Sequence, residues 1–134
     1  MKAITLMKII SASIAVFLVF PISATAHSSE LTLLSSLQKG EWTLKERGSQ
    51  TSKKLCLGDP AILLQIQHSG AACSRYVIQD KPGILRVSYK CGSSDHGVTT
   101  IKRESSGLIQ LQSQGIKANA PFSLNYEGRR TGSC

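Results

Sequence analysis

Four cysteines constrain this chain more than any other feature of its sequence. They are Cys56, Cys73, Cys91 and Cys134, and the last of them is also the final residue of the chain. An even number of cysteines in a small exported domain implies disulfides rather than free thiols. We therefore expect two disulfides, one of which ties down a chain end that would otherwise fray.

The N-terminus is organised like a secretory signal peptide. Two lysines open it, an apolar run follows from 9 to 20, and an A-x-A cleavage site ends at Ala26. The run is shorter than the roughly 20 apolar residues of a membrane span, and Pro21 closes it. No cysteine stands at the cleavage site itself, so a lipid anchor is not indicated. We expect residues 1–26 to be removed and residues 27–134 to form one periplasmic or secreted domain without a transmembrane anchor.

Nucleic-acid binding is not expected from the distribution of the basic residues. The chain of 134 residues carries 16 Lys and Arg against 8 Asp and Glu, a formal net charge of +8. The basic residues form only isolated pairs, and few aromatic residues stand near them to stack on bases. Such a surface keeps a protein soluble, and it also suits an anionic glycan.

The first part of the domain predicts a short helix followed by two strands. Leucines spaced over 31–37 are compatible with an amphipathic helix. Over 40–47, Trp42 and Leu44 alternate with polar residues, which predicts a half-buried strand. A turn then leads to a second strand over 51–57.

The spacing of apolar residues changes from alternation to a helical spacing after the second strand, which predicts a second helix over 59–67. Asp59 is a good N-cap, and Pro60 fits the first helical position. The apolar residues that fall on one face of this helix are Ile62, Leu63 and Ile66.

The segment 73–91 predicts a hairpin, because two β-rich runs flank the turn signal Asp80-Lys-Pro-Gly83. A register that places Asp80 opposite the end of the turn also places Cys73 directly opposite Cys91. Opposed residues in a non-hydrogen-bonded antiparallel pair have Cα atoms about 4.5 Å apart, which is within disulfide range.

Three further strands are predicted over 98–104, 108–114 and 122–130, with loops over 92–97 and 115–121. Sequential hairpins of this kind build an antiparallel meander. The predicted fold class is therefore all-β: a meander forming a small barrel or a strongly curved sheet, with one or two short helices.

If Cys73 and Cys91 close the hairpin, Cys56 and Cys134 remain for the second disulfide. This pairing is favoured because the last strand of a closed meander returns beside the first pair of strands. Two other patterns stay open: Cys56 with Cys73 and Cys91 with Cys134, or Cys56 with Cys91 and Cys73 with Cys134.

Three motifs resemble the domain-of-unknown-function 3617 family of small exported bacterial proteins. They are "GEWTLKE" near the start of the domain, "CLGDP" after the second strand and "YEGRRTGSC" at the end. The residues that match are the four cysteines together with Gly40, Trp42, Gly128, Arg129, Arg130 and Gly132. The first turn, "RGSQTSK", lacks a long insertion that many members carry. The resemblance implies a fold and a compartment but no reaction.

No residue pattern indicates catalysis, a metal or a cofactor. The candidate bases are His27, His68 and His96, and none has the spacing of a zinc site. The pair Asp95-His96 is most simply a turn. The chain also lacks a G-x-S-x-G turn and a glycine-rich phosphate loop. We therefore expect a protein that is not an enzyme.

Arg129 and Arg130 are the candidate anion-binding residues. Neighbouring residues of a strand face opposite sides, so the two could hold one carboxylate or phosphate only if the strand breaks there. Gly128 and Gly132 would permit such a break. The alternative is that one arginine covers Trp42 while the other is solvated.

These features favour a binding module of the bacterial envelope, with an envelope protein or an anionic glycan as its partner. The alternative is a lipocalin-like carrier, in which a closed barrel would hold a small apolar ligand.

Overall fold

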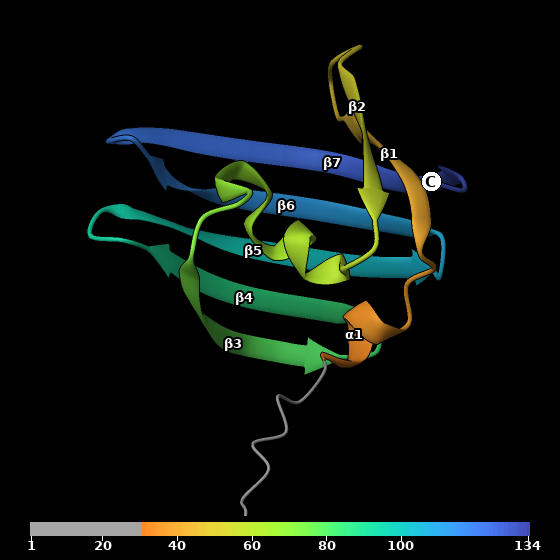
Figure 1. The fold of residues 1–134 in the computed structure, drawn as a ribbon, viewed down its shortest axis with the longest axis horizontal. Helices are drawn as coiled ribbons and strands as arrows, with labels where there is room; N and C mark the ends of the chain where they lie inside the picture. Colours follow the sequence, from red (N-terminus) through yellow and green to blue (C-terminus); the bar gives the residue numbers. More distant parts are fainter. Residues whose placement is uncertain (1–30) are drawn as a thin grey trace, which may run out of the picture.

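The computed structural model describes residues 31–134; the expected signal peptide and His27 lie outside the described residues. Two short helical segments accompany seven strands (Figure 1). The helical segments are α1 (Thr32–Ser35) and the 3₁₀ segment η1 (Pro60–His68). The strands are β1 (Gly40–Glu46), β2 (Ser52–Leu57), β3 (Cys73–Lys81), β4 (Ile84–Cys91), β5 (Asp95–Ser105), β6 (Leu108–Lys117) and β7 (Ala120–Gly132). Within residues 31–134, no helix has the length and hydropathy needed to cross a membrane.

The strands form one antiparallel sheet in the order β2-β1-β7-β6-β5-β4-β3. Strands β3 to β7 are a meander, as predicted, and the β1–β2 hairpin adds to it through β7, turned steeply away from the other strands in Figure 1. The predicted small barrel is wrong, because β2 and β3 are free edges that do not pair. The chain between these two strands forms η1 instead, and η1 lies across one face of β4, β5 and β6.

We call the face under α1 and η1 the covered face and the opposite one the open face. Alternation along each strand sends apolar side chains to the covered face, where they meet Leu33, Leu63 and Leu64 from the helical segments. The strand residues that complete this core are Trp42, Leu44, Leu57, Leu85, Val87, Ile101, Ile109, Leu111 and Tyr126. The protein's own side chains thus form a packed core between the sheet and the two helical segments.

The β3–β4 hairpin has the predicted cysteine register, but it reaches that register through a bulge. The turn sets Asp80 opposite Leu85, one position away from the predicted pairing. A register shift beside Ile78 then corrects this offset, so that Cys73 lies opposite Cys91. Without the extra residue, Cys73 would fall one position past its partner.

The segment η1 differs from the predicted helix in type and in its buried face. Asp59 caps it as predicted, since its Oδ1 accepts a hydrogen bond of 2.9 Å from the backbone N–H of Ala61. The segment is 3₁₀ rather than α, and Gln65 at φ −133° breaks it into two turns. Its buried residues are Leu63, Leu64, Gln65 and His68, whereas Ile62 and Ile66 are only half-buried.

Strand extends into both of the predicted loops, over 92–97 and 115–121. β5 begins at Asp95, and β6 and β7 meet at a two-residue turn of Ala118 and Asn119, whose φ angles are +49° and +63°. Asp95 joins these turns, because its Oδ1 accepts a hydrogen bond of 3.0 Å from the N–H of Ala118.

The disulfides are Cys56–Cys134 and Cys73–Cys91, the first of the three patterns considered. Their Cα atoms are 5.6 Å and 4.2 Å apart. Cys56 lies opposite Glu41 on one side of β1, and Gly132 lies opposite Glu41 on the other side. The last two residues of the chain therefore pass around the start of β1 to reach β2.

Candidate functional site

The open face of the sheet carries a continuous row of polar side chains. Arg86 lies opposite Thr100, Thr100 opposite Gln112, and Gln112 opposite Asn125, across four neighbouring strands. Each of these residues is next in sequence to a residue that points into the core, so the same alternation that builds the core builds this row.

Two depressions of the open face share the middle of this row. Their volumes are about 510 Å³ and about 280 Å³, and both are lined by Thr100, Lys102, Gln112 and Asn125. Arg86 lines the larger one. We call these five residues the polar floor. It offers a guanidinium, an ammonium, two amides and a hydroxyl on one side of the protein.

The two cations of the polar floor are not neutralised by ion pairs. Among residues 31–134, the ion pairs join Lys54 to Glu41, Arg129 to Glu127 and His68 to Asp95, and none includes Arg86 or Lys102. The polar floor therefore has two cations available to a negatively charged ligand.

The acids that border the polar floor already have partners. The hydrogen bond from Arg129 lowers the pKa of Glu127, and a second hydrogen bond from Gln110 lowers it further. Gln110 is itself held, because its Oε1 accepts a hydrogen bond of 3.1 Å from Nε of Arg47. Its amide nitrogen also donates to Glu104 at 3.3 Å. Arg47, Gln110 and Glu104 also line the smaller depression, so one acid lies in it together with a third cation.

Arg129 and Arg130 do not form a joint anion clamp in this structure. β7 continues through both residues, with Arg129 opposite Thr43 and Arg130 opposite Trp42, so they belong to opposite faces. Arg129 Nη2 lies 3.2 Å from a carboxylate oxygen of Glu127. Arg130 donates from Nε to the carbonyl oxygen of Lys39 at 2.8 Å and so holds the linker before β1.

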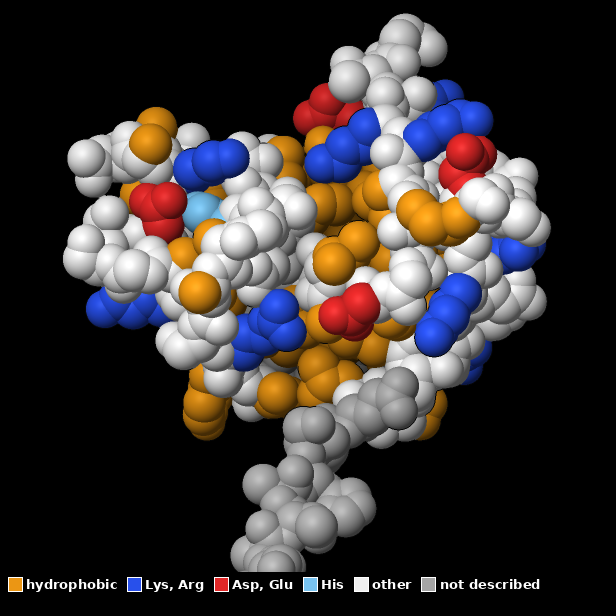
Figure 2. Space-filling model, viewed as in Figure 1, with side chains coloured by type: hydrophobic (Ala, Val, Ile, Leu, Met, Phe, Trp, Pro, Cys, Tyr) orange, Lys and Arg blue, Asp and Glu red, His pale blue; other side chains and the backbone are white. Residues whose placement is uncertain are grey.

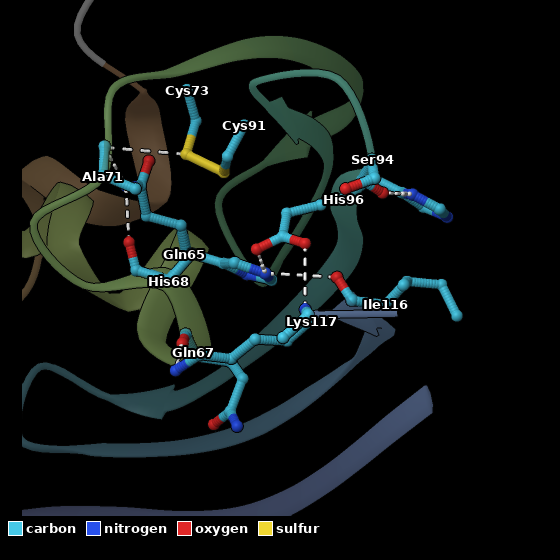
Figure 3. Close-up of polar contacts among 12 residues, drawn as sticks. Gln65, Gln67, His68, Ala71, Cys73, Cys91, Ser94, His96, Ile116 and Lys117 are labelled. Carbon is cyan, nitrogen blue, oxygen red and sulfur yellow. Dashed lines mark hydrogen bonds and ion pairs between the residues drawn. A yellow bond between two sulfur atoms is a disulfide. The ribbon is translucent and has the colours of Figure 1, made fainter. Parts of the chain in front are cut away.

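His68 is the most buried ionisable side chain that the sequence had singled out (Figure 3). Its Nε2 donates to the carbonyl oxygen of Ile116 at 3.1 Å and lies 3.4 Å from Oδ2 of Asp95. Since a carbonyl only accepts, this contact places the ring hydrogen on Nε2. Nδ1 is 3.0 Å from the hydroxyl of Tyr89, whose pKa is raised by burial. This cluster fastens η1 to β4, β5 and β6.

The prediction of a turn at Asp95-His96 is wrong, because both residues begin β5, and their side chains have different partners. Asp95 approaches His68, whereas Nδ1 of His96 lies 2.9 Å from the carbonyl oxygen of Ser94 at the exposed edge of the turn. Within residues 31–134, no three His, Cys, Asp or Glu side chains gather as metal ligands.

The polar floor was missed from the sequence, although a signal for it exists. Every second residue from 100 to 104 and from 110 to 114 is polar, which marks one face of each strand but not which strands lie side by side. The His68 cluster joins residues from η1, β4 and β5 and has no local signal.

Comparison with family models, with curated proteins and with solved structures finds no match to this chain.

Proposed function

We propose that this chain is an exported binding module of the bacterial envelope, and that the polar floor holds an anionic glycan. The observation that carries the proposal is the pair of depressions lined by Arg86, Lys102 and neighbouring amides, with no ion pair to either cation among residues 31–134. Sulfate, phosphate and carboxylate groups of a glycan would meet the cations, and its hydroxyls would meet the amides.

Membership of the domain-of-unknown-function 3617 family is part of this proposal. Apart from Cys73 and Cys91, the matching residues come from the first two strands and from the last strand with the chain end, and several of them meet where β1 pairs with β7. Gly40 is at φ +136°, and a Cβ there would collide with the carbonyl oxygen of Gly132 and approach Arg130. Trp42, opposite Arg130, is fully buried and donates from Nε1 to the carbonyl oxygen of Gln38 at 2.9 Å. A shared structural unit explains why these residues would occur together.

The experiment measures binding of the exported protein to heparin, with neutral dextran as the comparison glycan. Binding that persists at about 150 mM salt, where the screening length is about 8 Å, is expected of a formed site. Replacing Arg86 and Lys102 together by Gln should weaken binding about tenfold or more at that salt.

The matched control removes the same charge from elsewhere on the surface. Lys39→Gln with Lys81→Gln changes two exposed lysines outside both depressions and should leave heparin affinity nearly unchanged. Equal losses in the two double variants, or loss of all binding at about 150 mM salt, would show unspecific attraction and contradict the proposal.

A further inference from the structure

The edge strand β3 presents the most apolar surface of the described chain to solvent. It has nine residues and pairs only with β4. The large hydrophobic residues exposed among 31–134 are three consecutive residues of this strand: Tyr76 (71%), Val77 (42%) and Ile78 (48%). In Figure 1 β3 forms the lower border of the sheet, and apolar atoms project from that border in Figure 2.

The other edge of the sheet carries lysines near its middle, whereas the charged residues of β3 lie toward its two ends and are Arg75, Asp80 and Lys81. β2 has only six residues, and it carries Lys53 and Lys54 near its middle. Charged residues, lysine above all, keep an edge strand from pairing with another chain. The disulfide from Cys56 further covers the end of β2 with the C-terminus. If the sheet is extended by a partner, β3 is the edge at which that happens.

β3 is complementary to itself when read in the antiparallel direction. A two-fold axis between Val77 and Ile78 sets these two residues opposite each other, Tyr76 opposite Gln79 and Arg75 opposite Asp80. We call the contact between the two β3 strands the seam. Because of the two-fold symmetry, Arg75 of one copy lies opposite Asp80 of the other at both ends of the seam.

The bulge beside Ile78 makes this pairing geometrically consistent. Arg75 lies opposite Tyr89 and Asp80 opposite Leu85, and both of these β4 residues point into the core. Five positions along a regular strand would have put the two charges on opposite faces. The register shift at the bulge puts Arg75 and Asp80 both on the covered face. Two residues that lie opposite each other across the seam must be on the same face of the sheet.

Both charged groups keep a free atom for a partner. Arg75 donates to Oε1 of Gln65 from Nε at 3.2 Å and from Nη2 at 2.8 Å, which leaves its Nη1. Asp80 accepts from the N–H of Thr32 through Oδ2 at 3.2 Å, which leaves its Oδ1.

We propose that β3 pairs with β3 of a second copy of this chain, so that one antiparallel sheet runs through a two-fold dimer. Backbone hydrogen bonds form the seam, the exposed apolar residues cover it, and the Arg75–Asp80 pairs set its register. A seam of one strand per copy is a small interface, so the dimer is weak, with a Kd of about 10–100 µM.

The test is sedimentation velocity of the exported protein from about 1 µM to about 500 µM, a range that spans the expected Kd. A monomer–dimer equilibrium is expected. Ile78→Lys should raise the Kd about tenfold or more, because two new ammonium groups approach the axis. The matched control is Ser52→Lys on β2, which should leave the equilibrium unchanged.

Charge exchange tests the register itself. Arg75→Asp alone and Asp80→Arg alone each set like charges opposite one another and should raise the Kd about tenfold, whereas the two substitutions together should restore dimerisation. Thermal melts of each variant establish that it is folded.

Three results would overturn the proposal: a monomer throughout the concentration range, a dimer that Ile78→Lys leaves intact, or a double exchange that stays as weak as the single ones. Capture of an extended peptide on β3 by a chain that is otherwise monomeric would also overturn it, in favour of a different partner. Heparin binding by the polar floor depends on none of these outcomes, so the two proposals fail independently.

Discussion

The disulfide between Cys56 and Cys134 should supply a large share of the stability of this domain. Both cysteines are exposed, so replacing them together by Ala removes little packing. What the double substitution removes is a crosslink across 78 residues, which spans η1 and all the strands from β3 to β7. Its effect therefore lies in the unfolded chain, which gains conformational freedom.

Loop-closure entropy sets the magnitude. A loop of 78 residues corresponds to about 4.5 kcal/mol at 25 °C, and one of 18 residues to about 3.2 kcal/mol. The Cys73–Cys91 loop lies inside the larger one and shortens it to about 60 effective residues, which lowers the first value to about 4.3 kcal/mol. Small domains are stable by only about 5–15 kcal/mol, so the variant should be close to unfolding at 37 °C.

Equilibrium urea denaturation under non-reducing conditions measures this loss. We expect the free energy of unfolding to fall by about 4 kcal/mol and the m-value to rise, because the unfolded chain becomes less compact. Either single substitution, with the remaining thiol alkylated, should lose as much as the double one, since one crosslink is removed in each case. A loss below about 1.5 kcal/mol with an unchanged m-value would show that the bridge does not act through the unfolded chain.

Two further predictions follow from the core and its tyrosines. Thr99→Val should lower the free energy of unfolding by about 1–3 kcal/mol, because the buried Thr99 hydroxyl forms hydrogen bonds with Ser113 and with a carbonyl oxygen of η1. The matched control is Thr100→Val on the open face. An equal loss of stability in the two variants would contradict this reasoning. Burial raises the pKa of Tyr89 and of Tyr126, so the folded state favours the neutral phenols. The contribution of these phenols to the free energy of unfolding should be fully present below about pH 10 and should be lost as pH rises through the folded-state pKa values. Urea titrations between about pH 8 and pH 12 check this, and a free energy of unfolding that stays level over that range would refute it.

The β3–β4 hairpin shows how far local patterns reach. Alternation along 85–89 and the Pro-Gly turn were enough to pair the arms, but Cys73 comes to lie opposite Cys91 only through a bulge. The bulge beside Ile78 was not predicted, because the local sequence does not distinguish a bulged residue from a regularly paired one. The predicted register and the observed one agree at the cysteines and differ at the turn.

The segment 59–68 shows where local patterns mislead. Asp59 and Pro60 marked its start correctly, but the apolar spacing predicted an α-helix whose face would include Ile62 and Ile66. The segment must span the covered face within a few residues while placing Leu64 and His68 inward, and a kinked 3₁₀ path does so. That requirement comes from the sheet beneath it, not from the segment.

The sequence by itself determined the all-β class, the order of the elements and the inward face of most strands, because these depend on residue period and turn chemistry over a few neighbouring positions. Only the tertiary structure decided that the sheet stays open, that β7 continues unbroken through Arg129 and Arg130, and that Arg86 and Lys102 share one floor. Those outcomes depend on which strands become neighbours and on what fills the covered face. The strand neighbours and the filling of the covered face are set by contacts between residues far apart in the chain, so local sequence patterns do not predict them.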